Sequence, residues 1–265
     1  MLPKKMIFTD LDGTLLGADR TVSTLNRSLI AELKDQDIWV LPATGRSYNV
    51  SRHVLPGLDF PYYICFNGCV ITDQYGKILF EDALKPDLVW QIIKFCTEHN
   101  IAITAYQGED VFYNIDKPSM AGYLERTGLD VTHKFDHPTY KATQCYKMLI
   151  PETPDVIDDI EKQILGHFGE GLFNLSGSGG GRLEIYALSS NKGQAVKWLC
   201  DYLNIDINDA VAIGDADNDV EMLKSVGYSI AMGQSSDQAE VVAQYQTDNN
   251  ADNGWYNALV PFLAD

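Results

Sequence analysis

The chain has 265 residues, of which 45% are hydrophobic and 22% charged, and its formal net charge is −17 at pH 7. This composition is ordinary for a soluble globular protein, and the length allows one large domain or two modest ones. The negative charge disfavours nucleic acids and anionic membranes as partners, so an anionic substrate would need a local positive group or a bound cation.

Cysteine usage and the N-terminus indicate the cell compartment. The five cysteines are odd in number and form no C-x-x-C pair, so we expect reduced thiols. The apolar run after Lys4 and Lys5 stops at Asp10, too early for a signal peptide, and no uncharged apolar stretch is long enough to span a bilayer. We therefore expect a cytoplasmic protein.

The first predicted strand, residues 6–8, runs into the sequence Asp10-Leu11-Asp12-Gly13-Thr14. In an extended backbone, residues two apart project to the same side, so Asp10 and Asp12 would point together. Like charges that close resist joint ionisation unless a metal or a hydrogen-bond donor offsets them. The arrangement therefore indicates chemistry more than stability.

A helix capped by Ser23 and a buried strand over residues 38–41 follow, which gives the β–α–β unit of a parallel sheet. The apolar positions of this helix are Leu25, Leu29, Ile30 and Leu33. The second strand ends in Thr44-Gly45-Arg46, and Asn67-Gly68 predicts a hairpin turn within residues 64–71.

In residues 84–189 the pattern of strands and helices changes, and we predict that they form an inserted mixed α/β domain. Pro86 and Pro154 open helices, and strand-like runs cover residues 101–106, 146–150 and 183–186. The flanking segments, 1–83 and 190–265, would then form a second domain. A glycine-rich stretch, 176–181, matches no phosphate-binding motif and is interpreted as a flexible turn.

The βα pattern resumes at Asn191, which is expected to cap a helix that contains Lys192 in its first turn. A strand over residues 210–213, an acidic loop, a helix and a strand over 228–232 follow. The polar clusters thus fall just past strand carboxyl ends, where open α/β sheets bind ligands. We predict a Rossmann-like open parallel sheet interrupted by the insert.

The acidic loop, Gly214-Asp215-Ala216-Asp217-Asn218-Asp219, holds more acids than helix capping requires. Its spacing fits the start of an EF-hand, but Val220 and Val226 stand where that motif needs Gly and Glu. Lys192 is disfavoured by the helix dipole unless a phosphate lies nearby. Thr44 is equally ambiguous, as an N-cap or as a donor to phosphate oxygens.

Taken together and in this order, four clusters resemble the haloacid dehalogenase superfamily of phosphohydrolases. They are Asp10-Leu11-Asp12-Gly13-Thr14, Thr44-Gly45-Arg46, Asn191-Lys192-Gly193 and the loop 214–219. The insert is similar to the type IIB cap of Cof-like sugar-phosphate phosphatases. The resemblance therefore implies the superfamily's core fold with an α/β cap that selects the substrate.

The resemblance also implies roles for the matching residues. Asp10 would attack phosphorus and form an aspartyl-phosphate, and Asp12 would act as general acid and base. Mg²⁺ would be held by Asp10, the backbone carbonyl of Asp12, Asp215 and Asp219, in keeping with its preference for oxygen ligands. The groups expected to bind phosphate are Thr44, Gly45, Lys192 and Asn218, and those expected to contact the substrate are Arg46 and Arg182.

The resulting prediction is a Mg²⁺-dependent phosphatase of small phosphorylated metabolites, most readily sugar phosphates. A phosphomutase of hexose phosphates with the same core and cap is one alternative. A phospho-accepting signalling module is another, because it also clusters acids, Thr and Lys around Mg²⁺. Such a module needs only one domain and no general acid two residues beyond the nucleophile, so Asp12 and the insert argue against it.

Overall fold

The computed structural model describes residues 3–127, 132–135, 142–177 and 182–263. Within it the chain forms two compact units. The first combines residues 1–81 with 191–265, and the second comprises residues 82–190. Each unit has a sheet and a hydrophobic core of its own.

The first unit is built on a five-stranded sheet in the order β14-β13-β12-β1-β2, in which every pair of neighbours is parallel. Its strands are β1 (Lys5–Thr9), β2 (Ile38–Pro42), β12 (Val211–Gly214), β13 (Tyr228–Ala231) and β14 (Tyr245–Gln246). Its helices are α1 (Thr24–Asp35), α2 (Tyr48–Val54), α6 (Lys192–Leu203), α7 (Val220–Ser225), α8 (Asp237–Val242) and α9 (Gly254–Leu259). The open parallel sheet predicted from the sequence is thus confirmed.

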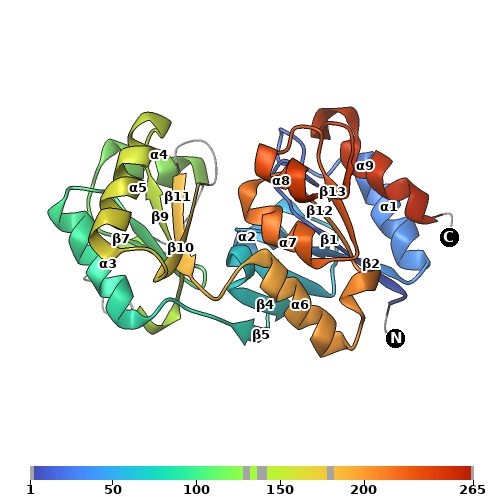
Figure 1. Cartoon of the computed structure of the whole chain (residues 1–265), viewed down its shortest axis with the longest axis horizontal. Helices are drawn as coiled ribbons and strands as arrows, with labels where there is room; N and C mark the ends of the chain where they lie inside the picture. The colour runs from blue at the N-terminus through green and yellow to red at the C-terminus, as the bar shows by residue number, and fades with distance from the viewer. Residues whose placement is uncertain (1–2, 128–131, 136–141, 178–181, 264–265) are drawn as a thin grey trace. The chain divides into compact units, whose positions relative to one another are not determined.

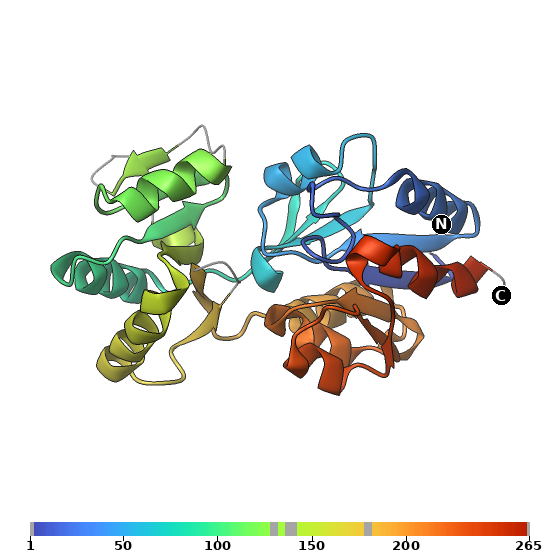
Figure 2. The same cartoon turned by 90° about the horizontal axis from the view of Figure 1, so that it is seen from above.

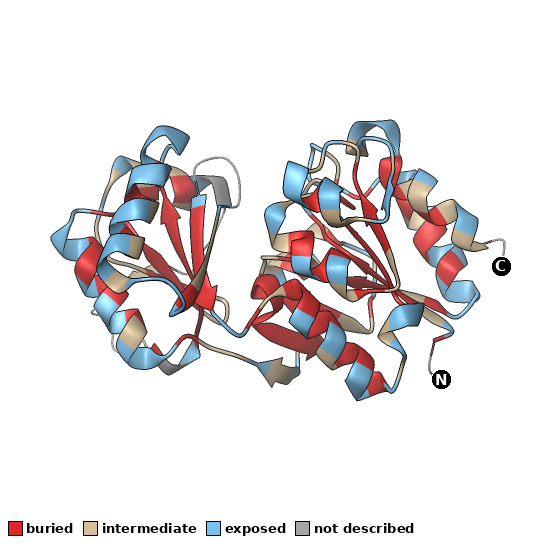
Figure 3. Cartoon of the chain, in the orientation of Figure 1, coloured by how far each residue is buried: buried red, intermediate tan, exposed pale blue. Residues whose placement is uncertain are grey.

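Helices cover both faces of this sheet, as parallel sheets require. Helices α1 and α9 lie together on one face, and α6 and α7 on the other, in both views (Figures 1 and 2). Apolar side chains of α6, α7 and the central strands form a common core, among them Met6, Phe8, Val196 and Leu223. Strands β1, β2, β12 and β13 are buried almost throughout, while the helices expose their outer faces (Figure 3). Because β1 and β12 pair in parallel, their carboxyl ends lie side by side.

A three-stranded antiparallel sheet also belongs to the first unit, in the order β3 (Tyr62–Cys65), β4 (Val70–Asp73) and β5 (Ile78–Glu81). The hairpin predicted around Asn67-Gly68 joins β3 to β4. Its loop places Phe66, Asn67 and Gly68 at positive φ values of 49°, 56° and 99°. A side chain at Gly68 would lie 2.3 Å from the carbonyl oxygen of Asn191, so the hairpin approaches the start of α6 at backbone distance.

The second unit is a six-stranded sheet in the order β10-β11-β9-β6-β7-β8. Its strands are β6 (Thr104–Gln107), β7 (Asp110–Tyr113), β8 (Thr132–Lys134), β9 (Cys145–Pro151), β10 (Phe173–Gly177) and β11 (Arg182–Ala187), and its helices are α3 (Pro86–Glu98), α4 (Pro118–Thr127) and α5 (Pro154–Phe168). The apolar faces of α3 and α5 pack on one side of this sheet through residues such as Val89, Ile92 and Ile160. No helix of the described residues combines the length and the apolar character needed to cross a membrane.

Two details differ from the sequence-based expectations. Leu25 is 38% exposed, and Asn26 points inward instead, where its Nδ2 donates to the carbonyl of Leu15. The strand expected from residue 101 begins only at Thr104, because the Ile101 amide closes helix α3 by donating to the Cys96 carbonyl. Asn100, at φ 55°, makes this helix end possible. Residues 178–181 of the glycine-rich stretch lie outside the described residues.

Candidate active site

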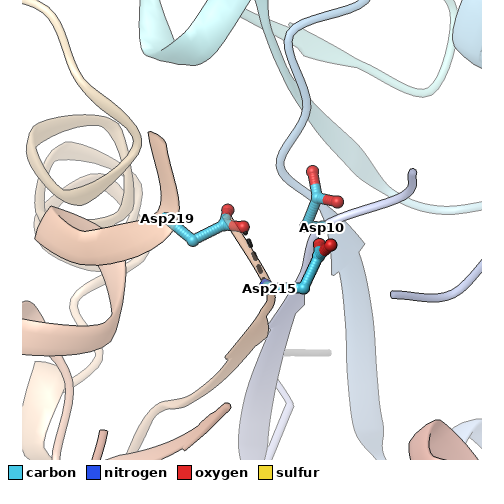
Figure 4. Close-up of side chains that lie close together, drawn as sticks. All are labelled: Asp10, Asp215 and Asp219. Carbon is cyan, nitrogen blue, oxygen red and sulfur yellow. Dashed lines mark hydrogen bonds between the residues drawn. The ribbon is translucent and has the colours of Figure 1, made fainter. Parts of the chain in front are cut away.

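The first two acids of the site stand where β1 and β12 end. Asp10 directly follows β1, and its amide donates to the carbonyl of Ile213 on β12 at 3.0 Å. Asp215 directly follows β12. Together with Asp219, these residues offer carboxylate oxygens that all lie within 4.8 Å of one another (Figure 4). The segments after β1 and β12, which are far apart in sequence, thus bring three acids together at the carboxyl ends of these strands.

Lys192 provides the positive charge of this cluster. Its Nζ lies 2.6 Å from Oδ1 of Asp10 and 2.6 Å from Oδ1 of Asp219, and its side chain is fully buried. The side chain reaches this position from the first turn of α6, whose N-cap Asn191 accepts a hydrogen bond from the Gln194 amide as predicted. A lysine buried at the unfavourable end of a helix dipole is therefore stabilised by two carboxylates.

The pKa values describe a crowded, desolvated set of charges. Burial raises the pKa of Asp10 well above its usual range; the Lys192 ammonium opposes this rise, and the Asp219 and Asp215 carboxylates add to it. Burial by itself lowers the pKa of Lys192, but Asp10 and Asp219 raise it above its ordinary value. Lys192 is therefore charged, and one cation is too few for three neighbouring acids.

Asp215 is held from the loop that follows β1. Thr14 donates its hydroxyl hydrogen to Oδ1 of Asp215 at 2.8 Å. A Cβ added at Gly13, which has a φ of 84°, would lie 2.3 Å from Oδ2 of Asp215, so only glycine fits under this carboxylate. Burial and then the Asp219 charge raise the pKa of Asp215 to about 6.

Asp219 uses both of its oxygens within the protein. Oδ1 accepts from Lys192, and Oδ2 accepts from the backbone amides of Asp215 and Ala216, each at 3.0 Å. The side chain is fully buried. Asp219 therefore supports the acidic loop and the lysine, and it has less freedom than Asp10 or Asp215 to bind a further group.

Asp12 lies outside the three-acid cluster found among the described residues, because its carboxylate faces an arginine. Oδ1 accepts from Nη2 of Arg46 at 2.6 Å, and Oδ2 accepts from Nε of the same residue at 2.7 Å. Arg46 was expected to contact substrate; in this structure it is paired with the residue expected to act as general acid.

Thr44, Gly45 and Asn218 meet around a residue that the sequence analysis assigned only to a turn, Asn67. The amide of Asn67 donates to the carbonyl of Thr44, and its Oδ1 accepts from Nδ2 of Asn218 at 3.0 Å. A Cβ at Gly45 would lie 3.0 Å from the same Oδ1. Asn67 was missed because Asn-Gly is a strong turn signal; its place two residues after the end of a buried strand could have revealed it.

Arg182, the remaining predicted site residue, belongs to the second unit. It is exposed and begins β11. Further along this strand, Glu184 forms a buried ion pair with Lys147 of β9 at 3.0 Å, and Lys147 lies over the ring of Tyr106. The assignment of Arg182 to substrate stays a prediction.

The residues at the end of β1 and β12 fit a divalent cation. The donor atoms are carboxylate oxygens, which Mg²⁺ prefers, and three such acids lie together beside the single charge of Lys192. A cation there would offset the repulsion among these carboxylates, which adds to the effect of burial in raising the pKa values of Asp10 and Asp215. Asp10 and Asp215 are thus the side chains best placed to hold it.

Comparison with known proteins gives one family. The sequence profile of the haloacid dehalogenase-like hydrolases matches residues 7–259. A 5-amino-6-(5-phospho-D-ribitylamino)uracil phosphatase of Bacillus subtilis is 26% identical over 96% of this chain and 94% of its own. An HMP-PP phosphatase of Citrobacter koseri is 28% identical over 86% of this chain and 84% of its own.

Solved structures share the whole fold. A phosphatase of the haloalkanoate dehalogenase superfamily from Bacteroides thetaiotaomicron superposes with a TM-score of 0.83 at 22% identity, over 99% of this chain and 98% of the other. A sugar phosphatase of subclass IIB in that superfamily gives 0.81 at 17% identity, over 98% and 99% of the two chains. The core and the insert therefore have the folds found in these two structures.

Proposed function

The chain belongs to the haloacid dehalogenase-like hydrolases, and from this premise we infer that it is a phosphoric monoester hydrolase that uses Mg²⁺ and an aspartyl-phosphate intermediate. One observation carries this proposal. The fully buried Lys192 contacts Asp10 at 2.6 Å, at the edge of the sheet where Asp215 also stands. A nucleophile, a cation that can bind phosphoryl oxygens and a metal-binding pair are thereby combined in one place.

The first step that we propose is attack by a carboxylate oxygen of Asp10 on phosphorus. The bond between phosphorus and the ester oxygen breaks, and Asp12 gives that oxygen a proton. Lys192 and the Thr44 hydroxyl, with the Gly45 amide, would balance the charge on the phosphoryl oxygens.

In the second step, a water molecule attacks the phosphorus of the aspartyl-phosphate. Asp12, now deprotonated, takes a proton from this water, and the bond between phosphorus and Asp10 breaks to release phosphate. Asn218, fixed by Asn67, is proposed to hold a phosphoryl oxygen through both steps.

The cation would be held by Asp10, Asp215 and the backbone carbonyl of Asp12, with Asp219 in support. When bound, Mg²⁺ supplies positive charge to the transferring phosphoryl group and orients it. The protein's own contribution is to hold the oxygen donors together: Thr14 fixes Asp215, and two backbone amides fix Asp219.

We propose that the substrates are small phosphorylated metabolites, sugar phosphates in particular, and that the inserted domain, residues 84–189, selects among them. The relatives support this class, because one acts on a phosphate carried by a ribityl chain and a structural neighbour is a sugar phosphatase. The net charge of −17 favours a small ligand over a polyanion, and we place the reaction in the cytoplasm.

A phosphate-release screen tests the proposal. Sugar phosphates, nucleotides and cofactor phosphates are incubated with the protein in Mg²⁺ and then in EDTA, and the organic product is identified. We expect Mg²⁺-dependent release from at least one sugar phosphate, and a loss of about 1,000-fold or more in kcat for Asp10→Asn with an unchanged circular dichroism spectrum. Undiminished release by Asp10→Asn rejects the nucleophile, and an isomerised hexose phosphate without phosphate release identifies a mutase.

A further inference from the structure

The pair between Asp12 and Arg46 is unusual for a residue expected to donate a proton to substrate. The guanidinium binds both carboxylate oxygens, at 2.6 and 2.7 Å, which is the two-bond geometry that makes arginine–carboxylate pairs strong and directional. Both oxygens therefore already have a partner. Neither can approach the ester oxygen of a substrate while the pair keeps this geometry.

The two partners differ in how firmly they are held. The Arg46 amide donates to Oγ1 of Thr44, its carbonyl accepts from the Phe66 amide, and its side chain is only 18% exposed. The side chain of Asp12 is 55% exposed. These contacts hold the backbone of Arg46, and we therefore take Asp12, the shorter and more exposed side chain, as the partner that moves when the pair opens.

The guanidinium needs new acceptors when Asp12 leaves. It carries five N–H donors and no acceptor, so it is matched by the oxygens of a polyhydroxylated or otherwise oxygen-rich leaving group. A leaving group without oxygen acceptors offers no such compensation. Opening of the pair is therefore coupled to the chemistry of the substrate.

We propose that Arg46 is a positioning residue that holds Asp12 in a resting orientation and releases it in exchange for oxygen atoms of the substrate's leaving group. The proposal rests on the proposed function, since it takes Asp12 as the general acid. It makes Arg46 an element of specificity: phosphomonoesters of sugars and polyols free the acid, and simple alkyl phosphates leave it bound.

The exchange predicts opposite effects on ligand affinity for the loss of Asp12 and for the loss of Arg46. Asp12 competes with the leaving group for the guanidinium, so removing Asp12 tightens binding of an oxygen-rich ligand, and removing Arg46 weakens it. A half-exposed bidentate pair corresponds to about a fivefold change in Kd. If Arg46 and Asp12 served only to stabilise the local structure, both substitutions would weaken binding.

The test is isothermal titration calorimetry in Mg²⁺, with every variant made in the inactive Asp10→Asn background. The probes are glucose 6-phosphate and methyl phosphate, which share the phosphoryl group and differ in leaving-group oxygens. We expect Asp12→Ala to increase the affinity for glucose 6-phosphate about fivefold more than the affinity for methyl phosphate. The change for methyl phosphate measures the increase in affinity that any anion obtains when one negative charge is removed.

Arg46→Met completes the cycle. We expect Arg46→Met to weaken the binding of glucose 6-phosphate more than that of methyl phosphate. Once Arg46 is absent, Asp12→Ala should no longer increase the affinity for glucose 6-phosphate selectively. Asp59→Ala is the matched control, because it removes an exposed acid paired with another arginine, Arg52, at 2.8 Å. This control should change neither Kd, and thermal unfolding verifies that each variant is folded.

The outcomes separate this proposal from the function on which it rests. Equal effects on the two probes, weaker binding by Asp12→Ala, or a selective gain that persists in Arg46→Met overturns the exchange and leaves the phosphatase assignment standing. If neither probe binds to any variant, the exchange is overturned, and the phosphate-release screen decides the phosphatase assignment by itself.

Discussion

Replacing Asp215 by Asn should stabilise the protein when no divalent cation is present. The Asp215 carboxylate is buried beside Asp219, and these two causes raise its pKa from 3.8 to about 6. Asparagine has nearly the same shape, carries no charge and keeps an oxygen that can accept from the Thr14 hydroxyl. The substitution therefore removes a buried charge and its repulsion by Asp219, while it retains the hydrogen bond.

The size of the effect follows from the pKa of Asp215. Because the folded chain holds this proton to a higher pH than the unfolded chain does, stability falls as the pH rises between 3.8 and about 6, and the loss is complete above that range. A rise to about 6 corresponds to about 3 kcal/mol at pH 7 and to roughly half of that at pH 5. We expect Asp215→Asn to recover about 2–3 kcal/mol at pH 7, or about 4–12 °C in Tm.

Thermal unfolding in EDTA, followed by tryptophan fluorescence, measures the difference, since three of the four tryptophans lie in the first unit. Mg²⁺ should stabilise the wild type by about 2.7 kcal/mol at 100 times its Kd and leave the variant unchanged, so that the gap closes. Asp217→Asn, in the same loop but exposed, is the control and should keep the Mg²⁺ response. A variant less stable than wild type in EDTA, or one that still responds to Mg²⁺, refutes the reasoning.

Three further predictions concern neighbouring residues. Lys192→Met leaves buried acids without their cation, so we expect about 3–5 kcal/mol of destabilisation in urea unfolding and no measurable phosphate release; wild-type stability would contradict the pairing. Gly13→Ala pushes a methyl group into Asp215 at a φ of 84°, so the Mg²⁺-induced rise in Tm should disappear, and a normal rise would argue against the close approach. Asp12→Ala should reduce kcat far more for sugar phosphates, which have a poor leaving group, than for p-nitrophenyl phosphate, and equal losses would remove its role as acid for the leaving group.

Most helices and strands could be located from the sequence, because capping residues, prolines and apolar spacing determine structure within a few neighbouring residues. Ser23 and Asn191 cap their helices through their side chains, as their residue types predict. Proline opens both long helices of the insert, α3 and α5. The alternation of strands and helices then implies a parallel sheet, and this sheet brings the segments after β1 and β12 together.

Side-chain partners within the site could not be predicted in this way. Arg46 and Asp12 are 34 positions apart, and no local pattern states that the arginine faces the acid and not the ligand. Asn67 carries a turn signal that conceals its contact with Asn218. Such contacts depend on loop geometry after the strands, which composition and periodicity do not specify.

The position of β1 between β12 and β2 has a consequence for protein synthesis. Its partner on one side, β2, is translated soon afterwards, but its partner on the other side, β12, begins only at Val211. On the ribosome, the growing chain therefore carries the apolar strand around Ile7 with one hydrogen-bonding edge open while the whole insert is made. We expect fragments that end at residue 190 to aggregate through this edge, and chaperones to be needed for the newborn chain.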